Sequence, residues 1–116
     1  MPKLVLDHSG TDELMERASA ALAKGDYFDT ASLCGRAMIQ ARRADDFERM
    51  ARVCLPLQEA RRHIRTQALD ARQIFVLDAL PTGRTRLESG CYVVQPPLIG
   101  LNANDLREML DRRRVA

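Results

Sequence analysis

The stretch from residue 47 to residue 70, FERMARVCLPLQEARRHIRTQALD, places the strongest constraint on the fold of this chain. Apolar residues recur along one side of it at helical spacing, and these are Phe47, Met50, Ala51, Cys54, Leu57, Ile64 and Ala68. Pro56 lies inside the stretch, and an internal proline costs about 3 kcal/mol unless the helix bends. Two structures remain possible: one long helix kinked at Pro56, or one helix that ends near Cys54 and a second with Pro56 in its first turn. We favour the kinked helix because the apolar stripe continues in phase past Pro56.

Two shorter helices precede this stretch, joined by a turn so short that they are expected to pack antiparallel. Thr11 is the predicted N-cap of the first helix, and Gly25 follows its end. Asp26 is the predicted N-cap of the second helix, which closes with Arg43 before a turn over residues 44–46. The predicted inner faces carry Leu14, Met15, Ala18, Ala21 and Leu22 in the first helix, and Phe28, Ala31, Cys34, Gly35 and Met38 in the second.

The pattern then changes from helix to strand. Residues 73–78 (QIFVLD) and 91–95 (CYVVQ) are rich in β-branched and aromatic side chains, which predicts two strands. A third, short strand is expected around residues 85–87, inside the loop that joins them. Two strands alone make a marginal sheet, so this part of the chain needs further support.

A last helix follows the second strand. Asn102 is its predicted N-cap, and Asp105 three residues later resembles the second half of a capping box. Leu101 and Leu106 have the spacing of a hydrophobic staple, in which a residue before the cap packs against one in the first turns.

The fold class that follows is mainly α: antiparallel helical hairpins, then a small β segment and a C-terminal helix. We divide the chain into an arm of residues 1–10, a helical module of residues 11–71 and a β-β-α segment of residues 72–116. Two strands with one helix form an incomplete α/β unit. The segment is therefore either the start of a truncated α/β domain in a longer protein, or its strands pair with Leu4–Leu6 or with a second copy of the chain.

Composition excludes several classes of function. The 18 basic and 16 acidic residues leave a net charge of +2, too small to steer the chain strongly to nucleic acid or to a membrane surface. No stretch approaches the 18 apolar residues of a membrane span, and no signal peptide is expected. Cys34, Cys54 and Cys91 form no C-x-x-C pair, which argues against disulfides and zinc and favours the reducing cytoplasm. We expect no metal and no cofactor.

Residues 11–70 resemble the tetratricopeptide repeat, a helix–turn–helix unit of about 34 residues. The match is best at the first turn, Gly25-Asp26-Tyr27, followed by Phe28 and Ala31. The remaining patterned positions fall on Met15, Ala18, Ser19, Leu22, Gly35 and Met38, and a second repeat opens with Phe47, Met50, Ala51 and Cys54. The resemblance covers about one and a half repeats. It implies a protein-interaction module whose concave face binds a peptide or another subunit.

An arginine cluster is the candidate surface for a partner. Its members are Arg49, Arg52, Arg61, Arg62 and Arg65. Arginine suits phosphates and carboxylates, but no aromatic platform for bases accompanies the cluster, and Glu48 and Glu59 lie nearby. A solvated helix face with local ion pairs therefore explains the cluster better than nucleic-acid binding does.

No catalytic constellation is visible. His8 and His63 have no second ligand at metal spacing, so each is expected to be an isolated surface histidine. Cys91 has no identifiable base, and Asp78 is a lone carboxylate after a strand. The leading hypothesis is a non-catalytic interaction or scaffold module with a protein or peptide partner. The alternatives are a fragment of a larger α/β ligand-binding or enzymatic protein and, more weakly, an arginine-mediated binder of RNA or an acidic partner.

Overall fold

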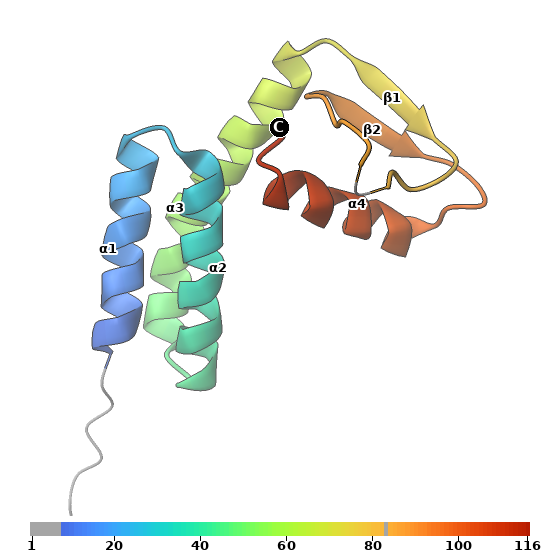
Figure 1. The fold of residues 1–116 in the computed structure, drawn as a ribbon. Helices are drawn as coiled ribbons and strands as arrows, with labels where there is room; N and C mark the ends of the chain where they lie inside the picture. The colour runs from blue at the N-terminus through green and yellow to red at the C-terminus, as the bar shows by residue number, and fades with distance from the viewer. Residues whose placement is uncertain (1–7, 83) are drawn as a thin grey trace, which may run out of the picture. The chain divides into compact units, whose positions relative to one another are not determined.

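The computed structural model describes residues 8–82 and 84–116 and divides the chain into two compact units, Met1–His63 and Ile64–Ala116. Its elements are α1 (Ser9–Ala23), α2 (Tyr27–Arg43), α3 (Phe47–Asp70), β1 (Ile74–Leu77), β2 (Cys91–Val94) and α4 (Gly100–Arg112) (Figure 1). This order confirms the predicted class, mainly α with a small sheet and a C-terminal helix. The boundary between the units falls inside α3. Leu4–Leu6, a predicted pairing segment, lies outside the described residues.

The two turns of the first unit have the same construction. Gly25 and Asp45 take positive φ angles of 79° and 52°, which ends α1 and α2 in the left-handed conformation. The next residues, Asp26 and Asp46, each return a backbone N–H to the last turn of the preceding helix at 2.9 and 2.8 Å. Each then caps the following helix by accepting a backbone N–H three positions on, at 3.3 and 3.1 Å. The prediction that Asp26 is an N-cap is confirmed.

The core of the first unit is built from small and aliphatic side chains. It contains Leu14 and Ala18 of α1, Leu33, Cys34 and Ala37 of α2, and Val53 of α3. Ala18, Ala37 and Val53 are completely buried. The predicted face of α1 is therefore correct in its buried residues. The predicted face of α2 included Cys34 but missed Leu33 and Ala37.

The predicted inner face of α3 is only partly correct: Leu57 packs against the core, but other members of the stripe do not. Phe47 is 72% exposed and Cys54 is exposed, whereas Val53 and Ala60 are the buried residues of the helix. Two apolar stripes satisfy the helical period here, and α3 turns the one through Val53, Leu57 and Ala60 toward the core. Val53 fills the space left beside small α1 and α2 side chains.

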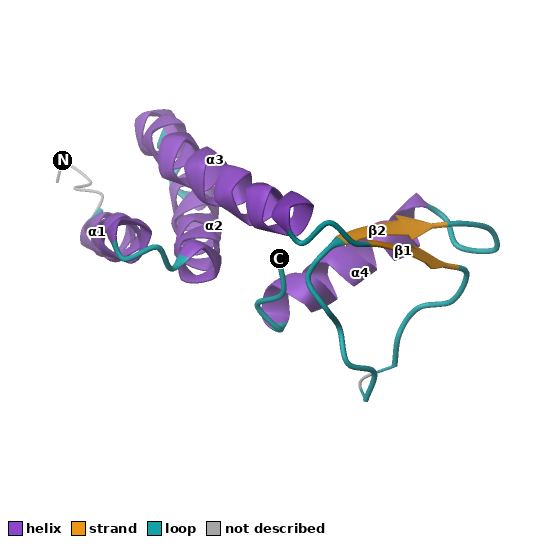
Figure 2. Ribbon diagram, turned by 90° about the horizontal axis from the view of Figure 1, so that it is seen from above, coloured by secondary structure: helices purple, strands orange, loops and turns teal. Residues whose placement is uncertain are grey.

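The alternative that splits this region at Pro56 is also wrong, because α3 is a single helix from Phe47 to Asp70. Figure 2 shows this helix beside α1 and α2. Pro56 is half-buried. Its ring lines the groove described below.

Helix α1 begins earlier than predicted. His8 occupies the N-cap position and Thr11 lies inside the helix, where it is only 6% exposed. The Thr11 hydroxyl donates to Oε1 of Gln40 on α2 at 3.2 Å. A tertiary partner therefore takes the hydroxyl that would otherwise cap the helix.

In the second unit, β1 and β2 pair in parallel, with Ile74 opposite Cys91 and Leu77 opposite Val94. Residues 85–87 form no strand, contrary to the prediction. That loop is instead held by Arg113, which donates to the carbonyl of Thr85 at 2.6 Å. A side-chain hydrogen bond from the end of α4 therefore holds this loop in place of strand pairing.

Helix α4 follows β2 and contacts it. Asn102 is not its N-cap: the helix begins at Gly100 after Ile99, and the Asn102 side chain accepts the Ile99 N–H at 2.8 Å. The predicted staple is wrong as well, because Leu101 is 73% exposed while Leu106 is buried. The earlier start of the helix moves Leu101 into its first turn and away from Leu106.

Candidate functional site

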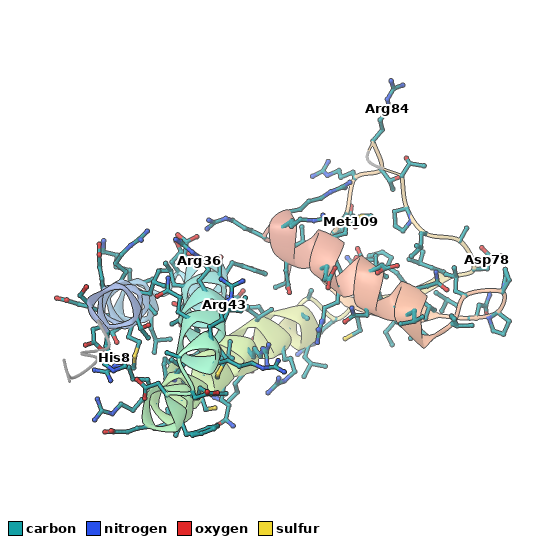
Figure 3. The ribbon with its side chains drawn as sticks, turned by 90° about the horizontal axis from the view of Figure 1, so that it is seen from below. His8, Arg36, Arg43, Asp78, Arg84 and Met109 are labelled. Atoms are coloured by element: carbon teal, nitrogen blue, oxygen red, sulfur yellow. The ribbon has the colours of Figure 1, made fainter. Side chains whose placement is uncertain are left out.

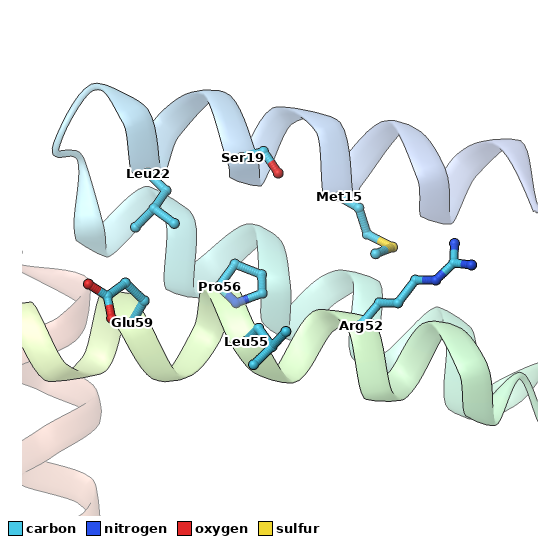
Figure 4. A pocket seen from close by; sticks show the side chains of 7 residues that line it. All are labelled: Met15, Ser19, Leu22, Arg52, Leu55, Pro56 and Glu59. Carbon is cyan, nitrogen blue, oxygen red and sulfur yellow. The ribbon is translucent and has the colours of Figure 1, made fainter.

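An open groove of about 490 Å³ lies between α1 and α3, within the first unit (Figure 4). One wall is a stripe of α1 formed by Met15, Ser19 and Leu22, which share one face at the i, i+4, i+7 spacing. The other wall is supplied by Arg52, Leu55, Pro56 and Glu59 of α3. The groove is therefore apolar in its middle.

The two walls differ in how firmly they are packed. Met15 is partly buried against the core, so the α1 wall is backed by packed side chains. Leu55 is 72% exposed, although a leucine of this size is stabilised by burial. Its neighbour Pro56 presents a rigid ring that has no backbone N–H to hydrate. Leu55 and Pro56 together offer apolar surface that water covers in the isolated chain.

The groove has opposite charges near its two ends. Arg52 lies beside Met15, and Glu59 lies toward Leu22 (Figure 4). They are seven positions apart on α3, which is about 10 Å along a helix. Arg52 is paired with Glu48, one turn earlier on the same helix. A ligand in the groove thus meets a cation at one end and a carboxylate at the other.

An ion-pair cluster at Arg49 joins the start of α1 to the start of α3. The Arg49 guanidinium donates to both carboxylate oxygens of Asp12, at 2.8 and 3.1 Å, and to Asp46 at 2.9 Å. His8, at the N-terminal end of α1 (Figure 3), places Nδ1 3.1 Å from Asp46. The Arg49 hydrogen bonds lower the pKa of Asp12 and of Asp46 and raise the pKa of Arg49 itself.

A second cluster surrounds Glu59. Its carboxylate accepts from Arg62 at 2.7 Å and lies 2.9 Å from Nε2 of His63. The hydrogen bond from Arg62 lowers the pKa of Glu59. The His63 ring stacks on Tyr27 of α2, with centroids 4.2 Å apart and planes 3° from parallel. The expectation of isolated surface histidines is therefore wrong for both His63 and His8.

The five predicted arginines lie along α3 and have different surroundings. Arg49 is held in its cluster, while Arg52 and Arg62 pair with Glu48 and Glu59. Arg61 and Arg65 are exposed, and neither makes an ion pair with another residue in the described ranges. That these arginines bind a partner stays a prediction.

The groove itself was missed from the sequence, although Arg52 was named as a candidate partner residue and Met15, Ser19 and Leu22 were named as positions of the repeat pattern. Its walls come from helices about 40 residues apart, so no local pattern connects them. One signal was present: Leu55 and Pro56 are adjacent apolar residues outside the predicted α3 stripe. An apolar pair off the core face indicates exposed apolar surface.

The remaining chemistry is limited. Within residues 8–82 and 84–116, no group of three or more His, Cys, Asp and Glu side chains is arranged to hold a metal ion. The three cysteines are free, and burial raises the pKa of the Cys34 thiol. Among the helices described, none combines the length and the hydropathy needed to cross a bilayer.

Comparison with known proteins leaves the class of protein open. The chain matches no protein-family model, no curated protein and no solved structure. Its resemblance to the tetratricopeptide repeat therefore stays a prediction.

Proposed function

We propose that this chain is a non-catalytic interaction module that binds a peptide segment of a protein partner in the groove between α1 and α3. The observation that carries the proposal is the apolar, solvent-open surface formed by Leu55 and Pro56 opposite Met15 and Leu22. Covering these side chains removes apolar area from water, which is the main driving force of association.

The groove specifies the chemistry of the segment. Its volume of about 490 Å³ falls within the usual range for ligand sites, so it accommodates a few apolar side chains. An acidic residue near Arg52 and a basic residue near Glu59 would complement the charges at the two ends. The segment therefore carries apolar residues between an acidic and a basic one, about 10 Å apart.

One ion pair joins the two helices that form the walls of the groove, and a ring contact holds α3 to α2, which supports binding without large rearrangement. Arg49 connects α1 to α3 through Asp12, and the stacked rings of Tyr27 and His63 connect α2 to α3. A groove with fixed walls loses less conformational entropy when a ligand enters it. The expected mode of binding is insertion of apolar anchors into a site that is already formed.

The test is a selection of binding peptides from a random display library on the whole chain. Selected peptides are expected to share the pattern acidic–apolar–basic and to bind wild type by fluorescence anisotropy. Leu55→Glu should abolish their binding, since it places a charge in the apolar middle. Ile39→Glu is the matched control, because Ile39 is 53% exposed on α2 outside the groove.

Circular dichroism of both variants establishes that they fold. Binding that is lost in Leu55→Glu and retained in Ile39→Glu supports the proposal. Peptides that bind both variants as tightly as wild type would overturn it, and so would a library that yields no binder. A charge-reversed peptide, basic–apolar–acidic, tests the polarity when its termini are blocked and its direction is kept.

A further inference from the structure

The outer edge of β1 carries unpaired backbone groups. The N–H groups of Cys91 and Gln95 donate to the carbonyls of Gln73 and Leu77, each at 2.9 Å. Those carbonyls therefore point to β2, and strand alternation turns the N–H and C=O groups of Ile74 and Val76 the other way. The sheet of the described residues contains β1 and β2 only, so no strand lies on that outer edge.

The outer edge of β2 is different. Its Gly90 N–H donates to the carbonyl of Ala116 at 3.1 Å, so the last residue of the chain covers the start of that edge. The β1 edge has no such cover within the described chain. An exposed, uncharged strand edge is a template for pairing with another strand.

One face of the sheet is also unusually apolar for an exposed surface. Ile74 is 72% exposed, Val76 57% and Val93 50%, and in the parallel register Val76 lies opposite Val93. Parallel sheets are normally covered on both faces. The half-buried residues on the other face include Phe75 and Tyr92, whose rings stack with centroids 4.9 Å apart.

We propose that a second copy of this chain pairs with this edge, β1 against β1 in antiparallel orientation, about a two-fold axis at Phe75. The inference is independent of the groove. This register sets Ile74 opposite Val76 of the second copy, and Val76 opposite its Ile74. Both are residues whose backbone groups point outward, so the pairing closes four N–H···O bonds. A shift of this register by one residue would place the outward-pointing backbone groups of one β1 strand opposite residues whose backbone groups point to β2.

The flanking charges select the same register. Arg72 and Asp78 lie three positions before and after Phe75, just outside the two ends of β1, with Arg72 in the turn after α3 at a φ of 54°, so each comes near the other residue where the paired strands end. Neither makes an ion pair with another described residue of its own chain. Asp78 directly follows β1. A register centred on Ile74 would place Arg72 opposite Val76, and one centred on Val76 would place Asp78 opposite Ile74.

Self-complementarity favours a second copy over an unrelated strand. At alternate positions the chain carries a basic, two apolar and an acidic residue, namely Arg72, Ile74, Val76 and Asp78. When a second copy runs in the opposite direction, the basic end of one strand meets the acidic end of the other and the apolar residues meet each other. The product is a four-stranded sheet in the order β2-β1-β1-β2. Its two β1 strands become central and lose their open edges.

Sedimentation velocity of the whole chain over a concentration series is the test, with wild type expected to form a reversible dimer. Val76→Pro removes an outward N–H while leaving the bonds between β1 and β2 intact, so it should give a folded monomer. Asp78→Arg and Arg72→Asp should each weaken dimerisation about tenfold, since both symmetric pairs become repulsive. The double variant Arg72→Asp/Asp78→Arg should restore it.

Amide hydrogen exchange gives a second readout. Exchange at Val76 should slow as the concentration rises, whereas exchange at Leu77, whose N–H faces β2, should not change. A wild type that stays monomeric at every concentration overturns the proposal. A dimer that survives Val76→Pro, or one that ignores both charge reversals, also overturns it. A dimer lost on deletion of residues 1–7 but kept in Val76→Pro would assign the interface to the N-terminal arm and overturn it too.

Discussion

Replacing Val53 with alanine tests how α3 joins the core of the first unit. Val53 is completely buried and is the α3 member of the core cluster, packed with Leu14, Leu33 and Ala37. The change deletes two methyl groups, worth about 0.8 kcal/mol each in transfer free energy. The cavity adds roughly 1 kcal/mol, because the small surrounding side chains cannot move in to fill it. We expect a loss of about 2.5 kcal/mol in the free energy of unfolding.

The measurement is urea unfolding followed by far-ultraviolet circular dichroism, with thermal unfolding as a check. For a chain of this size the expected loss corresponds to a melting temperature lower by roughly 10 °C. Cys54→Ala is the matched control, because Cys54 is the adjacent residue and is exposed. Its effect should stay within about 0.5 kcal/mol. A larger loss from Cys54→Ala than from Val53→Ala would refute the packing of α3 described above.

Three further predictions concern local features of the first unit. Asp45→Gly should stabilise the chain by roughly 0.5–1 kcal/mol, because Asp45 has a φ of 52° that glycine adopts without strain. Gly25→Ala should destabilise the chain by a similar amount, and urea unfolding midpoints measure both effects. Arg49 binds the carboxylates of Asp12 and Asp46, and the pKa of each is lowered from 3.8. Their contribution to stability is therefore present above about pH 4 and is lost as the pH falls through their folded-state pKa values. Arg49→Gln should therefore lower stability at neutral pH and make acid unfolding less steep, and equal slopes for the two proteins would contradict this. Cys54 should react with a maleimide in the native chain, whereas Cys34 should react only on unfolding, because burial raises the pKa of its thiol and blocks access; mass spectrometry of labelled peptides identifies the site.

Local chemistry explains which parts of the fold could be predicted. Asp26 caps α2 because its carboxylate reaches a backbone N–H three positions away, and Gly25 ends α1 because it takes a positive φ at no cost. Both interactions are complete within a few residues. The strand segments were equally recognisable, since their β-branched and aromatic residues are concentrated in short runs.

Features that depend on distant partners could not be predicted in the same way. Thr11 has the residue type of an N-cap, but Gln40, 29 positions away, takes its hydroxyl and the helix begins before it. Asn102 was predicted to be the N-cap, but it lies inside the helix at its third position, and its side chain accepts the N–H of the actual N-cap, Ile99. The candidate groove was missed because its walls meet only when α1 and α3 pack on α2.

The sequence by itself determined that three helices come first and that a β-β-α segment follows, because capping residues, turn residues and periodicity act over a few positions. Only the tertiary structure decided which stripe of α3 is buried. Both stripes satisfy a period of 3.6 residues, so the choice depends on how each fits the surface of small side chains on α1 and α2. Val53 fits that surface, and its burial leaves Leu55 and Pro56 on the groove.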